Sequence, residues 1–140
     1  IPYFTVEEVE RHIPKLQKHV GRMMELQDEL TALSGVKVSA EQTDWETEII
    51  SVNINKRFHE LSFKYFSELD AVIRIGGRVK DVTQGLVDFH SKLDGKDILL
   101  CWQYDDPALL YYHDLESGFA GRKPVSMIKE KLSEQLQRLR

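Results

Sequence analysis

The stretch that most constrains the fold is a helical pattern of about 35 residues, from 41 to 75. At a rise of 1.5 Å per residue, such a helix extends about 50 Å, which is longer than a domain of this size is wide. Its apolar residues form two adjacent lines, which make one broad stripe. The first line holds Trp45, Ile49, Val52, Phe63, Phe66 and Ile73, and the second holds Ile50, Ile54, Phe58, Leu61, Tyr65, Leu69 and Val72.

A first helix is predicted to precede this stripe. Thr5 and Glu8 have the spacing of a capping box, and apolar residues then recur at three- and four-residue steps as far as Leu33. Pro14 predicts a kink or break near residues 10–13, and Gly35 predicts the C-terminal end of the helix. The short connection over 36–40 implies an antiparallel helical hairpin. Because one helix cannot cover the broad stripe, we expect a homodimer through the long helices, as a four-helix arrangement.

The hydrophobic period changes after Gly76 and Gly77. Short β-branched, aromatic or leucine-rich runs over 79–82, 85–91, 97–104 and 109–115 predict an antiparallel β-meander, with a type I′ turn at Asp94-Gly95. Ser126 is expected to cap a short last helix. The predicted class is therefore α+β, as a single domain over 1–140. It divides into a helical hairpin (1–75), a β-meander with a glycine loop (76–125) and a C-terminal helix (126–140).

Composition excludes several classes of protein. With 41% hydrophobic and 30% charged residues, the chain is expected to fold around a packed core, and a single cysteine forms no internal disulfide. No apolar run approaches the roughly 20 residues that span a bilayer, so we expect a cytoplasmic protein with no membrane contact. The net charge is −4, and the short segment 126–140 is the only one of the three that carries a net positive charge. Nucleic acid is therefore an improbable partner.

The Asp94-Gly95 turn sorts the polar residues of the first hairpin. If these two residues form the turn, Asp88 falls opposite Cys101 and His90 falls opposite Leu99, on the face away from the predicted core. The core face then holds Val87, Phe89, Ile98, Leu100, Trp102 and Tyr104. The register of the next hairpin is open. In one of its two parities, His113 and Tyr111 join the face of Asp88 and Cys101.

That parity would gather Asp88, His90, Cys101 and His113, with Glu116 nearby. These are ligand types for zinc or another divalent transition metal, although the spacing matches no known metal signature. The same residues are candidates for catalysis as acid/base groups, or with Cys101 as a nucleophile activated by a histidine. The alternative is structural: a lone strand cysteine packs as a small apolar residue, and a histidine beside an aspartate forms a hydrogen-bonded pair.

The loop from Gly118 to Lys123 offers another candidate site. Gly118 and Gly121 permit close backbone approach, and Arg122 can hold a carboxylate or phosphate through two hydrogen bonds. We therefore consider a small anionic ligand here, with Trp102 as a further candidate contact. The alternative is a plain tight loop in which Arg122 pairs with Asp114 or Glu116.

Several of these motifs together resemble a known family. They are Phe4-Thr5-Val6-Glu7-Glu8, Ile13-Pro14-Lys15-Leu16, Gly85-Leu86-Val87-Asp88-Phe89, Leu100-Cys101-Trp102, Tyr112-His113 and the run from Gly118 to Val125. In this order they resemble the uncharacterised bacterial family called domain of unknown function 2203, over about residues 4–125. The resemblance favours Asp88, Cys101, Trp102, His113, Glu116 and Arg122 as site residues. His90, Asp105-Asp106 and Tyr112 depart from the family pattern.

Two functions follow from these observations. The first is a dimeric binding or interaction module without chemistry of its own. The second is a metal-dependent enzyme, for instance a hydrolase, with its site around Asp88, Cys101, His113 and Glu116.

Overall fold

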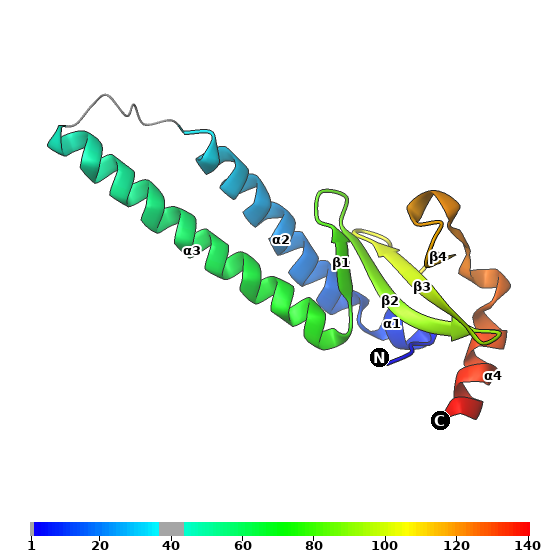
Figure 1. The fold of residues 1–140 in the computed structure, drawn as a ribbon. Coiled ribbons are helices and arrows are strands. Elements are labelled where there is room, and N and C mark those ends of the chain that lie inside the picture. The colour runs from blue at the N-terminus through cyan, green and yellow to red at the C-terminus, as the bar shows by residue number, and fades with distance from the viewer. Residues whose placement is uncertain (1, 37–43) are drawn as a thin grey trace.

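The computed structural model describes residues 2–36 and 44–140. Two long helices, α2 (Ile13–Ser34) and α3 (Trp45–Ile75), pack side by side as an antiparallel arm that projects from a head (Figure 1). The head contains a five-stranded antiparallel sheet together with α1 (Val6–Arg11) and α4 (Lys129–Leu139). The predicted α+β class is confirmed. Within the described residues, no helix has the length and apolar character needed to cross a membrane.

The first helix is divided where Pro14 predicted a break. The α1 capping box is present, since the Thr5 hydroxyl accepts from the Glu8 N–H and the Glu8 carboxylate accepts from the Thr5 N–H. Helix α1 ends at Arg11, and α2 begins at Ile13 with Pro14 in its first turn. Proline is tolerated there because the first N–H groups of a helix have no partner within it.

Helix α3 begins and ends with clear signals. The Asp44 carboxylate accepts from the Thr47 N–H at the N-terminus, and Gly76 ends the helix in the left-handed region with φ of 110°. The predicted start extended to residue 41, and residues 41–43 lie outside the described part of the chain.

The sheet is a meander with strand order β1-β2-β3-β4-β5. Asp94 and Gly95 both have positive φ, 52° and 76°, as the predicted type I′ turn requires. The edge strand next to β4, β5, was not predicted from the sequence. The strands are β1 (Arg78–Asp81), β2 (Leu86–Leu93), β3 (Lys96–Gln103), β4 (Tyr111–Asp114) and β5 (Lys123–Pro124).

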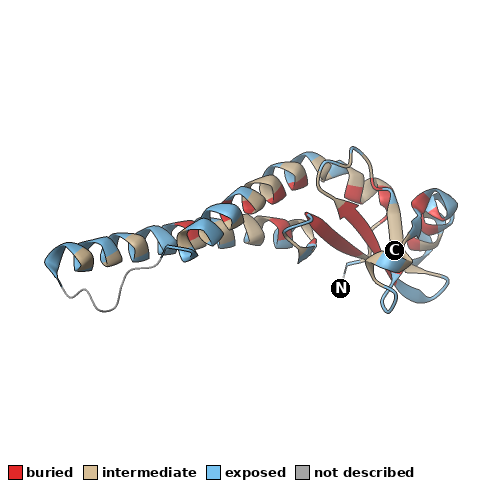
Figure 2. Cartoon of the chain, turned by 90° about the horizontal axis from the view of Figure 1, so that it is seen from above, coloured by how far each residue is buried: buried red, intermediate tan, exposed pale blue. Residues whose placement is uncertain are grey.

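The hydrophobic core lies between one face of this sheet, the head helices α1 and α4, and the ends of α2 and α3 that join the head. Phe89, Leu100 and Trp102 are fully buried there against residues such as Leu16 and Leu132. Figure 2 shows the buried residues concentrated in the head and in the half of the arm next to it, while the far half of the arm is exposed. The core therefore fixes the sheet and leaves the tip of the arm with little cover.

The predicted cap of the last helix was wrong. Val125–Met127 form a short 3-10 helix, and α4 begins at Lys129 without a side-chain cap. The Val125 N–H donates to the Leu110 carbonyl, and Val125 and Ile128 are both buried. This anchoring beside β4 holds the chain in a 3-10 turn around Ser126, so that α-helical geometry begins only at Lys129.

Gly76 provides a test of how the arm joins the head. A Cβ at Gly76 would overlap the Phe4 ring, whereas a Cβ at Gly95 would meet no atom within 4 Å. Both glycines have positive φ, so alanine at either position costs about 1 kcal/mol of backbone strain. We expect Gly76→Ala to lower the free energy of unfolding by about 1–3 kcal/mol more than Gly95→Ala, measured by urea denaturation. Equal losses would show that the Phe4 contact does not constrain this junction.

Candidate metal centre

The sheet register brings three chemically reactive side chains together. Asp88 lies opposite Cys101 in the β2–β3 pair, as predicted. In the β3–β4 pair, Cys101 lies opposite Tyr111, and Leu99 lies opposite His113. The second hairpin therefore has the parity that places His113 on the face of Asp88 and Cys101. One ligand atom from each of these three residues lies within 4.8 Å of the other two.

All three side chains are excluded from water. The exposed fraction is 2% for Asp88, 3% for Cys101 and 1% for His113. Two of their polar atoms, Asp88 Oδ1 and His113 Nε2, are buried without a hydrogen-bond partner. A buried polar atom without a partner costs about 1–3 kcal/mol, so a pair of them requires an explanation.

The tautomer of His113 follows from the hydrogen bond that its Nδ1 makes. Nδ1 lies 2.8 Å from the backbone carbonyl oxygen of Asp114. A carbonyl only accepts, so Nδ1 carries the proton and donates it. In the neutral ring, Nε2 is then a bare lone pair, which is the form in which histidine binds a metal. The hydrogen bond to the Asp114 carbonyl fixes the orientation of the ring, as such a bond does for a histidine that binds a metal.

The bare nitrogen faces a carboxylate oxygen. His113 Nε2 and Asp88 Oδ1 are 3.6 Å apart, too far for a direct hydrogen bond. A nitrogen and an oxygen ligand of one tetrahedral ion, with bonds of about 2.0–2.2 Å, lie about 3.3–3.6 Å from each other. The observed separation thus fits two atoms that share an ion better than two atoms that share a proton.

Cys101 is held in its protonated form when no metal is bound. Burial raises the pKa of the thiol to about 12, and the negative charge of Asp88 and a hydrogen bond with it act in the same direction. Lys80 and Arg122 oppose this rise through their positive charges. A thiol with so high a pKa is a poor nucleophile at neutral pH, although a bound metal would displace its proton.

A loop covers the three residues. Strands β4 and β1 lie toward opposite edges of the sheet. The chain after β4 reaches Gly118, where a Cβ, if present, would lie 3.5 Å from Nζ of Lys80 on β1. The strands between them, β2 and β3, carry Asp88 and Cys101. The Arg122 guanidinium stacks on the rings of Tyr111, at 4.3 Å, and Phe119, at 4.0 Å. This loop explains why a face opposite the main core is dry.

The other predicted site residues are distributed differently. Glu116 is exposed and lies outside the group of three, and its N–H donates to Asp114 Oδ1. Trp102 lies on the core face of β3, where its Nε1 donates to the Asp106 carbonyl, so it does not join Arg122. Gly121 lies against Ser117, since a Cβ there would overlap the Ser117 side chain.

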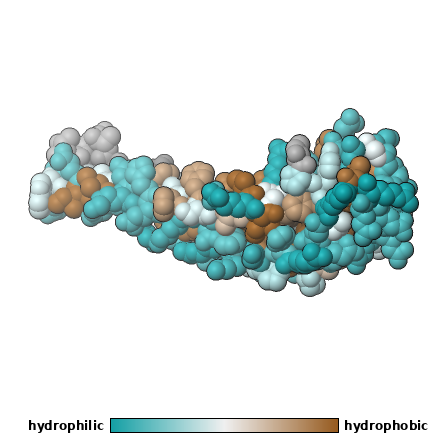
Figure 3. Space-filling view, turned by 90° about the horizontal axis from the view of Figure 1, so that it is seen from below, coloured by the Kyte–Doolittle hydropathy of each residue, from teal (hydrophilic) through white to brown (hydrophobic). Residues whose placement is uncertain are grey.

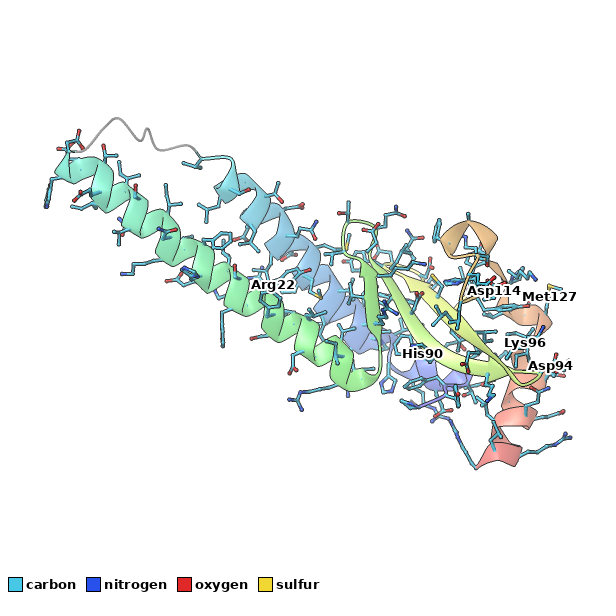
Figure 4. All side chains as sticks on the ribbon, viewed as in Figure 1. Arg22, His90, Asp94, Lys96, Asp114 and Met127 are labelled. Carbon is cyan, nitrogen blue, oxygen red and sulfur yellow. The ribbon has the colours of Figure 1, made fainter. Side chains whose placement is uncertain are left out.

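Figure 4 shows the polar residues around the sheet. His90 lies on β2 between the arm and the hairpin tip, and Asp94 and Lys96 mark that tip beside the C-terminal helix. His90 shares the face of His113 through their common neighbour Leu99, but it is not one of the three clustered residues. The ion pairs of the described residues do not include Arg122, so the predicted pairing with Asp114 or Glu116 is not formed.

Sequence reasoning missed Lys80 and the aromatic partners of Arg122. Lys80 belongs to β1, whose pairing with β2 is interrupted by an irregularity between Val79 and Asp81. Strand alternation therefore could not assign its face. Tyr111 was placed on the site face in one parity, but nothing in the pattern showed that the loop after β4 would fold back over it.

The burial of Cys101 yields a prediction about its reactivity. Relative to an ordinary thiol, a pKa of about 12 lowers the thiolate fraction at pH 8 by about a thousandfold, and the covering loop blocks access as well. We expect the folded protein to react with Ellman's reagent at least a hundredfold more slowly than the same protein in urea. Reaction of native Cys101 at the rate of a free thiol would contradict this description of the site.

The chain was compared with known proteins. The family model described as an uncharacterized conserved protein, DUF2203, matches residues 2–125. No curated protein and no solved structure matches the chain. The match covers most of the chain, including both long helices, the sheet and the covering loop. The chain therefore belongs to the DUF2203 family.

Proposed function

We propose that this protein binds a divalent transition metal, best fitted by zinc, through Asp88, Cys101 and His113. The observation that carries the proposal is the buried pair of lone-pair atoms, Asp88 Oδ1 and His113 Nε2, 3.6 Å apart beside the Cys101 thiol. Carboxylate, imidazole and thiolate are together the donors that zinc uses in proteins. A cation between them satisfies both unpaired atoms at once.

The alternative is a proton in place of the metal. A doubly protonated His113 would form a buried ion pair with Asp88, but at 3.6 Å it would make a poor hydrogen bond. It would also leave a fixed charge pair next to a thiol in a dry site, where desolvation is expensive. The metal accounts for all three side chains, whereas the proton accounts for two.

The site supports a binding role more strongly than hydrolysis. Its three side chains are at most 3% exposed, so a substrate would have to displace the covering loop. Glu116, the expected fourth member and acid/base candidate, is exposed outside the group. A metal held here would stabilise the packing of the loop on the sheet, as structural zinc sites do.

We predict that the purified, untagged protein binds one zinc ion per chain. Because zinc binds the folded state preferentially, a concentration one hundred times the dissociation constant should add about 2.7 kcal/mol to the free energy of unfolding. Asp88→Ala, Cys101→Ala and His113→Ala should each lose most of this stabilisation.

His90→Ala is the matched control, because His90 lies on the same sheet face outside the group of three. It should keep both the stoichiometry and the stabilisation. Wild-type protein that shows neither bound zinc nor a thermal shift with zinc, cobalt or manganese would refute the proposed function.

We further propose that Arg122 binds a small anion, which serves as a fourth ligand of the metal beside the three side chains. With Asp88 and the Cys101 thiolate, a divalent ion is neutral, and Lys80 and Arg122 then leave positive charge acting on the site. The Arg122 guanidinium stacks on the rings of Tyr111 and Phe119, and its N–H edge is the group that can bind an oxyanion.

Acetate should therefore stabilise the zinc-loaded protein beyond the effect of chloride at the same ionic strength, and the metal-free protein much less. Arg122→Ala should abolish the acetate effect while keeping zinc. Lys123→Ala, the exposed neighbour, serves as the control. If acetate stabilises Arg122→Ala as it does the wild type, Arg122 is not an anion ligand.

A second candidate function is self-association through the arm, favoured by the large apolar side chains that α3 exposes. Trp45, Phe63 and Phe66 are 73%, 75% and 62% exposed. Side chains of this size on one helix are a feature of protein interaction surfaces. In the space-filling view, hydrophobic surface gathers at the tip of the arm and again partway along it (Figure 3). We propose that this surface makes the chain a homodimer.

A further inference from the structure

Most of the large exposed apolar residues of α3 follow a heptad repeat, and Ile50 and Phe58 lie outside it. Steps of four and three residues connect nine positions in a single line, which we call the outer seam: Trp45, Ile49, Val52, Lys56, His59, Phe63, Phe66, Asp70 and Ile73. Every residue of the outer seam is exposed. Alternating steps of four and three define the contact line of a coiled coil, so the spacing fits a second helix.

The outer seam is on the opposite side of α3 from α2 and the core. Leu61 and Val72 are the buried residues of α3. Phe63 follows Leu61 by two residues, which turns the helix by about 200°. The arm therefore uses one side of α3 for its own helical hairpin and presents the seam to the outside.

The surface of α3 also contains a hollow of a size that can accept a side chain. A hollow of about 320 Å³ near the tip of α3 is lined by Trp45, Glu48, Ile49, Val52 and Asn53. Trp45, Glu48, Ile49 and Val52 are related as residues i, i+3, i+4 and i+7, the four corners of the hole that accepts a knob in a coiled coil. The seam of α3 itself carries two large knobs, Phe63 and Phe66.

From this match we infer that α3 pairs with α3 of a second copy in antiparallel orientation, with Ile49 packed against Phe66 and Val52 packed against Phe63. This inference rests on the homodimer proposed above and specifies its interface. In this register the numbers of two facing residues always add up to 115. Two-fold symmetry forms each contact twice, which gives four apolar layers and places a phenylalanine in each tip hollow.

The polar residues of the seam favour this orientation. In the antiparallel register, Lys56 lies opposite His59 of the second copy, near the two-fold axis, and Asp70 lies opposite Trp45 at the ends. A parallel pair in register would place Asp70 against Asp70, whereas the antiparallel register keeps the two Asp70 residues at opposite ends of the dimer. Like charges that face each other in a helix interface are destabilising, so the seam disfavours the parallel arrangement.

Light scattering at 20 µM tests the association. We expect about 33 kDa, twice the 16.3 kDa of one chain. Phe63→Glu and Phe66→Glu should each reduce the mass to that of one chain, because a charge replaces an apolar layer. Lys64→Gln, next to the seam and with the same one-unit change in charge, should remain dimeric. A wild-type monomer, or a dimer unaffected by both glutamates, would overturn the inference.

Cysteine cross-linking tests the orientation. The double variant Val52→Cys/Phe63→Cys should form a covalent dimer on mild oxidation. Val52→Cys alone should not, because its two copies lie about 16 Å apart along the antiparallel axis, beyond the reach of a disulfide. Efficient cross-linking of Val52→Cys alone would overturn the antiparallel register in favour of a parallel one.

These results are separable from the metal proposal. Zinc stoichiometry per chain is measured independently in each α3 variant, and it also shows that the head is folded. A wild-type monomer that binds one zinc ion per chain would refute the α3 pairing and leave the metal proposal intact. A wild-type dimer that binds no zinc would refute the metal proposal and leave the α3 pairing intact.

Discussion

The constraint that shapes the candidate site is the close approach of His113 to Asp88. Because the His113 Nδ1–H donates to the Asp114 carbonyl, the imidazole turns a bare Nε2 toward a carboxylate oxygen in a buried site. Two facing lone pairs at 3.6 Å repel each other, and a positive charge between them would relieve that repulsion. The Cys101 thiol beside them extends the pair to a three-donor set, which a divalent metal would complete.

The rest of the fold keeps this set in place. The core face of the sheet, with Phe89 and Trp102, is packed against the helices, so β2 and β3 are rigid where they carry Asp88 and Cys101. The loop after β4 crosses the other face and excludes water from it. Arg122, stacked on Tyr111 and Phe119, attaches that loop to the sheet. The ends of the arm helices join the same core through residues such as Leu16 and Val72, whereas the outer seam lies on the other side of α3.

Residues whose local signals were strong could be predicted well. Asp94-Gly95 determines the β2–β3 register because a type I′ turn needs two positive φ angles, and the pairing of Asp88 with Cys101 follows from it. The β3–β4 connection has no such turn, so the face of His113 remained open until the structure was known. Ser126 resembled a helix cap, but the burial of Val125 and Ile128 overrides local preference there. Long-range folding of the loop over Tyr111 leaves no short-range pattern.

X-ray absorption spectroscopy of the zinc-loaded protein tests the central claim most directly, because it reports the atoms bound to the metal. The account predicts one sulfur ligand at about 2.3 Å, with nitrogen and oxygen ligands at about 2.0–2.2 Å. The sulfur contribution should disappear in Cys101→Ser. A spectrum of the wild-type protein with nitrogen and oxygen ligands alone would contradict the proposed centre.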